Sequence, residues 1–112
     1  SQKMNINSIN RVELQGRVGT VRMHYAGDVQ TAVFSIATET VYENALTHGT
    51  VVETTWHSVA TRPGLKQSLD GLSKGAVVRV TGRLRNTRYT DANGIERTFT
   101  EVVADSLKVL EM

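Results

Sequence analysis

The sequence predicts an all-β fold, and three observations lead to this prediction. Apolar and polar side chains alternate with a period of two, for example along residues 11–18. Residues 51–60 are rich in β-branched side chains, which favour extended chain. Turn signals such as Asn93-Gly94 separate the alternating segments. A chain of 112 residues has the usual length of one domain, so these strands should share one core.

Five segments have the strand pattern. In chain order they are residues 11–18, 31–38, 51–60, 78–85 and 98–109. In the last segment the alternation slips near Val102-Val103, which predicts a bulge there. Residues 23–28 and 41–49 are expected to be loops or hairpin tips, and residues 91–94 a tight turn between the last two strands.

One segment departs from the alternation. Residues 63–72 can place Leu65, Leu69 and Leu72 on one helical face, and Pro63 suits a helix start. A short helix is therefore predicted between strands 3 and 4. Five strands with a helix after the third is the order of a five-stranded OB-fold barrel, although other small barrels have related patterns. Glycines that help a small barrel bend lie in the first and fourth strands, at Gly16, Gly19 and Gly82.

The composition excludes several kinds of site. The chain has no cysteine, which rules out disulfides, thiolate zinc sites and a cysteine nucleophile. His24, His48 and His57 lack metal-ligand spacing, and the glycines form no phosphate-cradling loop, so no metal or cofactor is expected. No apolar run approaches the ~18 residues of a membrane span, and the first ten residues do not resemble a signal peptide. We therefore expect a cytoplasmic protein with no membrane partner.

The charge is unevenly distributed. The net charge is only +2, from 13 Lys and Arg against 11 Asp and Glu. Residues 79–97, however, carry five arginines against two acids. A basic stripe on a nearly neutral chain favours a directed anionic partner.

Six pieces of the chain, taken in order, resemble the bacterial single-stranded DNA-binding proteins. Residues 54–59, Thr-Thr-Trp-His-Ser-Val, resemble the Thr-Glu-Trp-His segment of their third strand. The other pieces are residues 10–19, 34–38, 72–75 with 78–85, 89–94 and 100–104. The resemblance covers about residues 10–111.

The resemblance implies an OB-fold domain over residues 10–112, preceded by an extension of residues 1–9. It implies a protein that is not an enzyme and that coats single-stranded DNA in replication, repair or recombination. It also implies a homo-oligomer, usually a tetramer, associated with the nucleoid. Family members commonly end in an acidic tip that recruits proteins. The given sequence ends at Met112 without one, which leaves protein partners open.

Coating a strand without reading its sequence requires aromatic rings that stack on bases. Trp56 is the only tryptophan, and its neighbours of the same phase, Thr54 and Ser58, form a half-polar face. The resemblance assigns stacking to Trp56, and also to Tyr42 and Tyr89. The alternatives are a core tryptophan and two solvent-facing tyrosines. The two phenylalanines are expected in the core, at Phe34 and Phe99.

The coat also requires cations along the phosphates. The residues predicted to contact phosphates are Arg83, Arg85, Arg88, Lys74, Arg97 and Arg11. The alternative for the strand arginines is a solvated barrel face. Arg62 departs from the family, which has an aromatic residue at this place. A guanidinium can stack or pair with phosphate, so Arg62 is kept among the predicted DNA contacts.

His57 is implied to lie at a subunit contact, as the matching histidine does in the family. Catalysis by His57 and Ser58 is not expected, because adjacent strand residues point to opposite faces. A second reading is an OB-fold adaptor for proteins, such as a primosome or mobile-element accessory subunit. The departure at Arg62 and the lack of an acidic tip favour that alternative.

Overall fold

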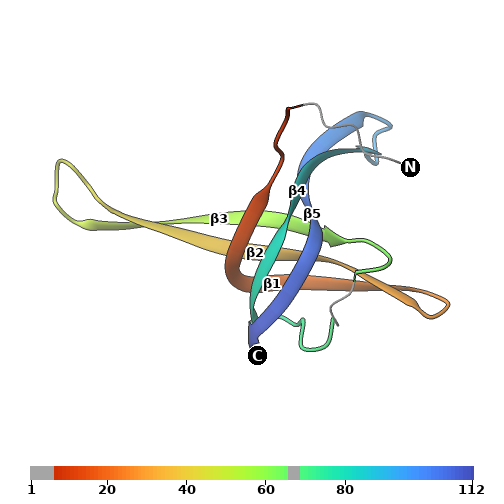
Figure 1. The fold of residues 1–112 in the computed structure, drawn as a ribbon. Coiled ribbons are helices and arrows are strands. Elements are labelled where there is room, and N and C mark those ends of the chain that lie inside the picture. Colours follow the sequence, from red (N-terminus) through yellow and green to blue (C-terminus); the bar gives the residue numbers. More distant parts are fainter. Residues whose placement is uncertain (1–6, 66–68) are drawn as a thin grey trace.

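In the computed structural model, which describes residues 7–65 and 69–112, five strands close into a barrel (Figure 1). The strands are β1 (Val12–Ala26), β2 (Val29–Glu43), β3 (Thr50–Thr61), β4 (Val77–Thr90) and β5 (Glu96–Glu111). Around the ring the order is β1-β2-β3-β5-β4. All neighbours are antiparallel except β3 and β5, which pair in parallel over three residues, Val59 to Thr61 against Val102 to Ala104. The predicted all-β class and number of strands are confirmed.

The strands are longer than the sequence pattern predicts, because they continue beyond the barrel as hairpin arms (Figure 1). Residues 23–28 were expected in a loop or hairpin tip; residues 27–28 form the tip, whereas residues 23–26 are paired with residues 29–32 of β2. Gly27 has a φ of +63° in the two-residue turn. Residues 41–43 likewise belong to β2, and only residues 44–49 form the tip of the next hairpin. Pairing between exposed strands has no hydrophobic alternation, so the pattern could not show it.

The core lies inside the barrel. Its largest fully buried side chains come from all the strands except β1, and they are Phe34, Ile36, Leu107, Val59, Val78 and Val80. Val18 of β1 is also buried in it. The predicted core position of Phe34 is confirmed. Gly16 and Gly82 allow the strands to coil closely, because a Cβ at either would collide with a carbonyl oxygen of the adjacent strand.

The bulge predicted near Val102-Val103 lies elsewhere in β5. The β4–β5 ladder is continuous across these two residues and shifts between Ala104 and Ser106, so Asp105 is the extra residue. The alternation slips because residues 101–104 are all buried, on both faces of β5. When both faces of a strand are buried, consecutive apolar residues interrupt the alternation in the same way as a bulge does.

No helix is present in the described part of residues 63–72; residues 66–68 lie outside the described residues. Gly64 has a φ of +90°, which an α-helix cannot contain, and the described residues 63–65 and 69–72 include turns at 63–64 and 70–71. The predicted helix is therefore corrected to turns in the part that the structure describes. Gly71, with a φ of +82°, has the conformation that would also suit the helix end expected there. The three leucines that the helical spacing singled out still contact the core: Leu69 and Leu72 are buried in it and Leu65 packs against it. The described residues contain no helix long and apolar enough to cross a membrane.

Candidate nucleic-acid interface

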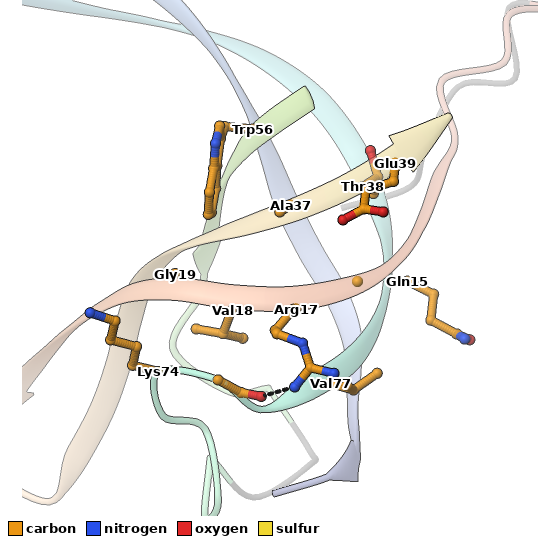
Figure 2. A pocket seen from close by; sticks show the side chains of 12 residues that line it. Gln15, Arg17, Val18, Gly19, Ala37, Thr38, Glu39, Trp56, Lys74 and Val77 are labelled. Atoms are coloured by element: carbon orange, nitrogen blue, oxygen red, sulfur yellow. Dashed lines mark hydrogen bonds between the residues drawn. The ribbon is translucent and has the colours of Figure 1, made fainter. Parts of the chain in front are cut away.

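Trp56 lies on the outer surface of the barrel, and the residue is 61% exposed. It is paired with Ala37 of β2, and its six-membered ring extends over Gly19 of β1 (Figure 2). A Cβ at Gly19 would stand 2.5 Å from the ring carbon Cζ3. The indole therefore occupies space that is free because Gly19 has no side chain. The alternative interpretation, in which Trp56 is a core residue, is wrong.

A groove of about 500 Å³ runs beside Trp56 and is lined by β1, by residues 37–39 of β2, including the acid Glu39, and by the turn before β4. Backbone hydrogen bonds hold this turn against β1: Val18 donates to Ala76 at 2.8 Å, and Gly75 donates to Val18 at 2.9 Å. Lys74 is thereby placed on the lining of the groove with Trp56 (Figure 2). Of the predicted phosphate contacts, Lys74 is the one that shares this groove with the indole.

Two further arginines near Trp56 were not predicted. Arg17 lines the same groove and donates from Nη1 to the carbonyl of Gly75 at 2.6 Å. Arg22 lines an adjoining hollow of about 440 Å³ together with Ser35 and Ser58. Arg17 is on the polar phase of the predicted first strand, which does not distinguish it from a solvated charge. Arg22 lies five residues further on, and it is exposed as well because the β1–β2 register shifts between Val18 and Val21, which the sequence pattern did not show. We call the outer surface that carries Trp56, Gly19, Lys74, Arg17 and Arg22 the Trp56 face.

The second aromatic group lies on the part of the β4–β5 hairpin that extends from the barrel, residues 85–101, which we call the β4–β5 arm. Tyr89 and Phe99 form an edge-to-face pair with ring centroids 5.8 Å apart and planes at 66°. They are 47% and 39% exposed. The prediction of a core position for Phe99 is therefore wrong. The alternation is the same on the barrel and the arm, but only the barrel has an interior.

The arginines of this arm are paired with acids. Arg85 donates to Glu101 at 2.5 Å, and Thr87 donates to the same carboxylate oxygen at 2.6 Å. Arg97 donates to Asp91 at 2.6 Å. This contact, with backbone N–H groups of the turn, lowers the pKa of Asp91. The excess of positive charge in residues 79–97 is therefore partly compensated by Glu101, which follows this segment in the chain, whereas Asp91 lies within it.

Arg88 is arranged differently. It lies on the opposite face of the arm from Tyr89 and Arg85, because odd spacing along a strand changes the face. Its guanidinium is 77% exposed and stands 3.7 Å from Glu96. The three arginines predicted together thus divide between two faces, with Arg83 and Arg85 on the Tyr89 side.

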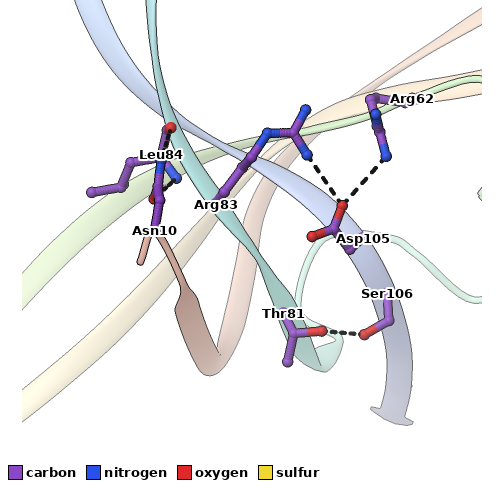
Figure 3. Close-up of polar contacts among 7 residues, drawn as sticks. All are labelled: Asn10, Arg62, Thr81, Arg83, Leu84, Asp105 and Ser106. Atoms are coloured by element: carbon purple, nitrogen blue, oxygen red, sulfur yellow. Dashed lines mark hydrogen bonds and ion pairs between the residues drawn. The ribbon is translucent and has the colours of Figure 1, made fainter. Parts of the chain in front are cut away.

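Arg62 and Arg83 meet at one carboxylate. Arg62 follows β3 directly, Arg83 belongs to β4, and both contact Oδ1 of Asp105, at 3.4 and 3.3 Å (Figure 3). The bulge places Asp105 at this point. The departure from the family pattern at Arg62 therefore belongs to a cluster of charges, the Arg62–Asp105–Arg83 cluster.

Tyr42 and Arg11 lie apart from these groups. Tyr42 is 47% exposed on the β2–β3 arm, within β2 rather than in the loop that was expected. The ladder places it on the opposite ribbon face from Trp56, five residue pairs away. Arg11 is exposed immediately before β1.

His57 is half-buried on the opposite face of β3 from Trp56, as predicted. Its Nε2 is 2.7 Å from the hydroxyl oxygen of Thr38. Ser58 lies on the other face and forms no catalytic pair with it. Within residues 7–65 and 69–112, no three His, Asp or Glu side chains are grouped so that they could hold a metal ion.

Comparisons with known proteins agree on one family. The profile of the Single-strand binding protein family matches residues 9–110. The chain is 36% identical over 110 residues to the Xenopus laevis mitochondrial single-stranded DNA-binding protein 1-A, with 89% of this chain and 75% of that protein covered. It is 35% identical over 109 residues to the mitochondrial single-stranded DNA-binding protein of Rattus norvegicus, with 89% and 72% covered.

Solved structures give the same result for the fold. The Plasmodium falciparum SSB in complex with ssDNA matches with a TM-score of 0.78 and 26% identity, over 97% of this chain and 99% of that one. A deletion mutant of the single-stranded DNA binding protein from Thermus aquaticus matches with a TM-score of 0.72 and 20% identity, over 92% and 51%. At that identity the second match concerns the fold alone.

Proposed function

From the premise that this chain belongs to the single-strand binding protein family, we propose that it binds single-stranded DNA without reading its sequence. It does so by stacking and charge, as a non-enzymatic protein. The observation that carries the proposal is the indole of Trp56, a residue that is 61% exposed, over Gly19 and beside Lys74. A ring so exposed contributes little to the core, whereas every base offers a face on which it can stack.

On the Trp56 face, we propose that a base stacks on the indole while Lys74, Arg17 and Arg22 contact the adjacent phosphates. Lys74 lines a second hollow, of about 390 Å³, together with Trp56, Thr20 and Ser35. Cations on either side of a ring allow one stretch of backbone to be held while its base is stacked.

On the β4–β5 arm, we propose that Tyr89 and Phe99 act as one stacking platform. They share a face with Arg85 and Arg97 in the ladder. A ring supported edge-on by another ring loses little further freedom when a base stacks on it. Phe99 thereby supplies aromatic surface in a chain that has an arginine at position 62.

The remaining predicted contacts stay part of the proposal with smaller roles. Tyr42 offers a separate ring for stacking on the opposite face of the β2–β3 arm from Trp56, and Arg11 and Arg88 contribute charge at the edges of the bound strand. Their exposure supports these roles.

A direct test is to titrate the protein with oligothymidylate and record tryptophan fluorescence. Trp56 is the sole tryptophan, so quenching reports on this ring alone. We expect quenching together with a mobility shift of labelled oligothymidylate, and a much weaker shift of duplex of the same length. Unchanged fluorescence without retardation of oligothymidylate would contradict the proposal and favour the adaptor alternative, and equal retardation of duplex would contradict a preference for single strands.

We further propose that the protein is a homotetramer in which His57 lies at a subunit contact. A half-buried imidazole, already bonded to Thr38, supports this placement, and closed symmetric assemblies are the commonest kind. Light scattering at micromolar concentration should give four times the mass of the chain. A strict monomer would overturn the proposal.

The process that we propose is the protection of single strands during replication, repair or recombination. The relatives named above are mitochondrial proteins. A cytoplasmic, nucleoid-associated location remains our sequence-based proposal, and fractionation of cells that express the protein tests it.

A further inference from the structure

The Arg62–Asp105–Arg83 cluster holds two guanidinium groups and one carboxylate on the outside of the barrel (Figure 3). The Arg62, Arg83 and Asp105 side chains are 53%, 39% and 51% exposed. One positive charge therefore remains uncompensated at a place that solvent and ligands can reach.

The two ion pairs of this cluster are loose. Both arginines share a single oxygen, Oδ1, at 3.4 and 3.3 Å. Charge-assisted bonds are normally about 2.7–2.9 Å long, and Arg97 reaches its own acid, Asp91, at 2.6 Å. Asp105 therefore satisfies neither arginine fully, whereas an anion with more oxygens could engage both.

The space between these side chains is a polar groove of about 630 Å³, lined by Asn10, Arg62, Arg83 and Asp105. Asn10 fixes one wall: its amide donates to the carbonyl of Leu84 and accepts from the N–H of Leu84, each at 2.9 Å. Asp105 is the extra residue of a bulge, so the strand ladder does not depend on where its carboxylate points. One wall of the groove is therefore rigid, whereas the carboxylate of Asp105 can turn away and leave its place to another anion.

We propose that a backbone phosphate of the bound strand replaces Asp105 between Arg62 and Arg83, so that Asp105 is an internal competitor that weakens DNA binding. The inference rests on the proposed function. A phosphodiester has the same charge as the carboxylate, and its two free oxygens can each take one guanidinium fork. At position 62 the chain then holds the strand by its phosphate rather than by a base.

The test compares two substitutions that remove the same charge. Asp105→Asn removes the competitor, whereas Asp28→Asn makes the same change at the tip of the β1–β2 hairpin. At low salt, Asp105→Asn should bind oligothymidylate about two- to fivefold more tightly than Asp28→Asn does, the range expected for one exposed ion pair. In an Arg62→Ala background the gain from Asp105→Asn should largely disappear, because the phosphate has then lost one of its two partners.

Equal affinities of the Asp105→Asn and Asp28→Asn variants would overturn the inference, and so would a gain of the same size in the Arg62→Ala background. Because both outcomes require a wild-type protein that binds oligothymidylate, they leave the proposed function intact. Failure of the wild type to bind would instead overturn the proposed function. Should Asp105→Asn fold poorly, the guanidinium NMR signals of Arg62 and Arg83 in the wild type replace it: both should shift when oligothymidylate is added, and two unshifted signals would refute the inference.

Discussion

The Trp56 face and the β4–β5 arm carry the same chemistry, rings and arginines, in two different electrostatic states. On the arm, Arg85, Arg97 and Arg88 each lie within 4 Å of an acid. On the Trp56 face, no carboxylate of the described residues pairs with Lys74, Arg17 or Arg22. The comparison teaches that a count of arginines overstates the charge offered to an anion. A cation already paired within the chain must give up one partner to gain another.

The largest effect expected on this comparison is that of Trp56→Ala. The Trp56 face should lose about 1–3 kcal/mol of binding free energy for the stacked base. The melting temperature should change little, because the residue is 61% exposed. Calorimetric titration with oligothymidylate and thermal unfolding of the same variant measure the two quantities. A large loss of stability with unchanged affinity would return Trp56 to the core interpretation.

Phe99→Ala tests the rings of the other region. Loss of the edge-to-face partner of Tyr89 should cost about 0.5–1.5 kcal/mol of binding free energy, because Tyr89 then stacks without support. Tyr25→Ala is the matched control, since Tyr25 is an exposed aromatic residue, 72% accessible, on a different hairpin. Oligothymidylate affinity should fall for Phe99→Ala alone. Equal losses for both variants would mean that the platform has no special role.

The charge difference itself is tested by salt dependence. Lys74→Ala should reduce the magnitude of the slope of log affinity against log salt by about 0.7, the value for one phosphate on a single strand. Arg85→Ala should reduce it less, because in the free protein Arg85 is neutralised by Glu101 rather than by solution ions. Titrations at four or more salt concentrations measure both slopes. A larger decrease of the slope for Arg85→Ala than for Lys74→Ala would contradict the expected difference between the β4–β5 arm and the Trp56 face.

The smallest effect concerns the ion pair at the tip of the arm. Arg97 lowers the pKa of Asp91 below its ordinary value of 3.8, so the carboxylate is stabilised in the folded state. Its contribution is fully present above that ordinary value and is lost as the pH falls through the folded pKa. Asp91→Asn should therefore lower the melting temperature slightly at neutral pH, and the difference should shrink in strong acid. A difference that stays constant with pH would assign the effect to the turn rather than to the charge.

The barrel could be predicted from the sequence because its strands have one buried and one solvent-exposed face, and Phe34 and Ile36 follow that alternation. The extended arms could not be predicted, because residues 23–26 and 41–43 are exposed to solvent on both faces and show no such alternation. Phe99 was placed wrongly for a different reason: the alternation continues along the β4–β5 arm, where no barrel interior lies behind it. The short segment at residues 63–72 read as a helix because its leucine spacing is helical, whereas the backbone at Gly64 is not.

The exposed position of Trp56 could be predicted from the sequence, whereas the ion pairs of the arginines could not. The single tryptophan and its polar neighbours of the same phase, Thr54 and Ser58, can be recognised from the sequence alone. The acids opposite Arg85 and Arg83 are 16 and 22 residues away along the chain. Only the ladder register brings them together, and register requires three-dimensional structure.

Gly19 has a consequence for how such chains vary. The residue contributes no side chain to the surface, yet the position of the indole depends on it, since a Cβ there would stand 2.5 Å from the ring. Positions 19 and 56 should therefore covary among relatives. A relative with a larger residue at the position of Gly19 should carry a smaller ring, or none, at that of Trp56. In such a relative, changing only one of the two positions back should give a less fit protein than changing both.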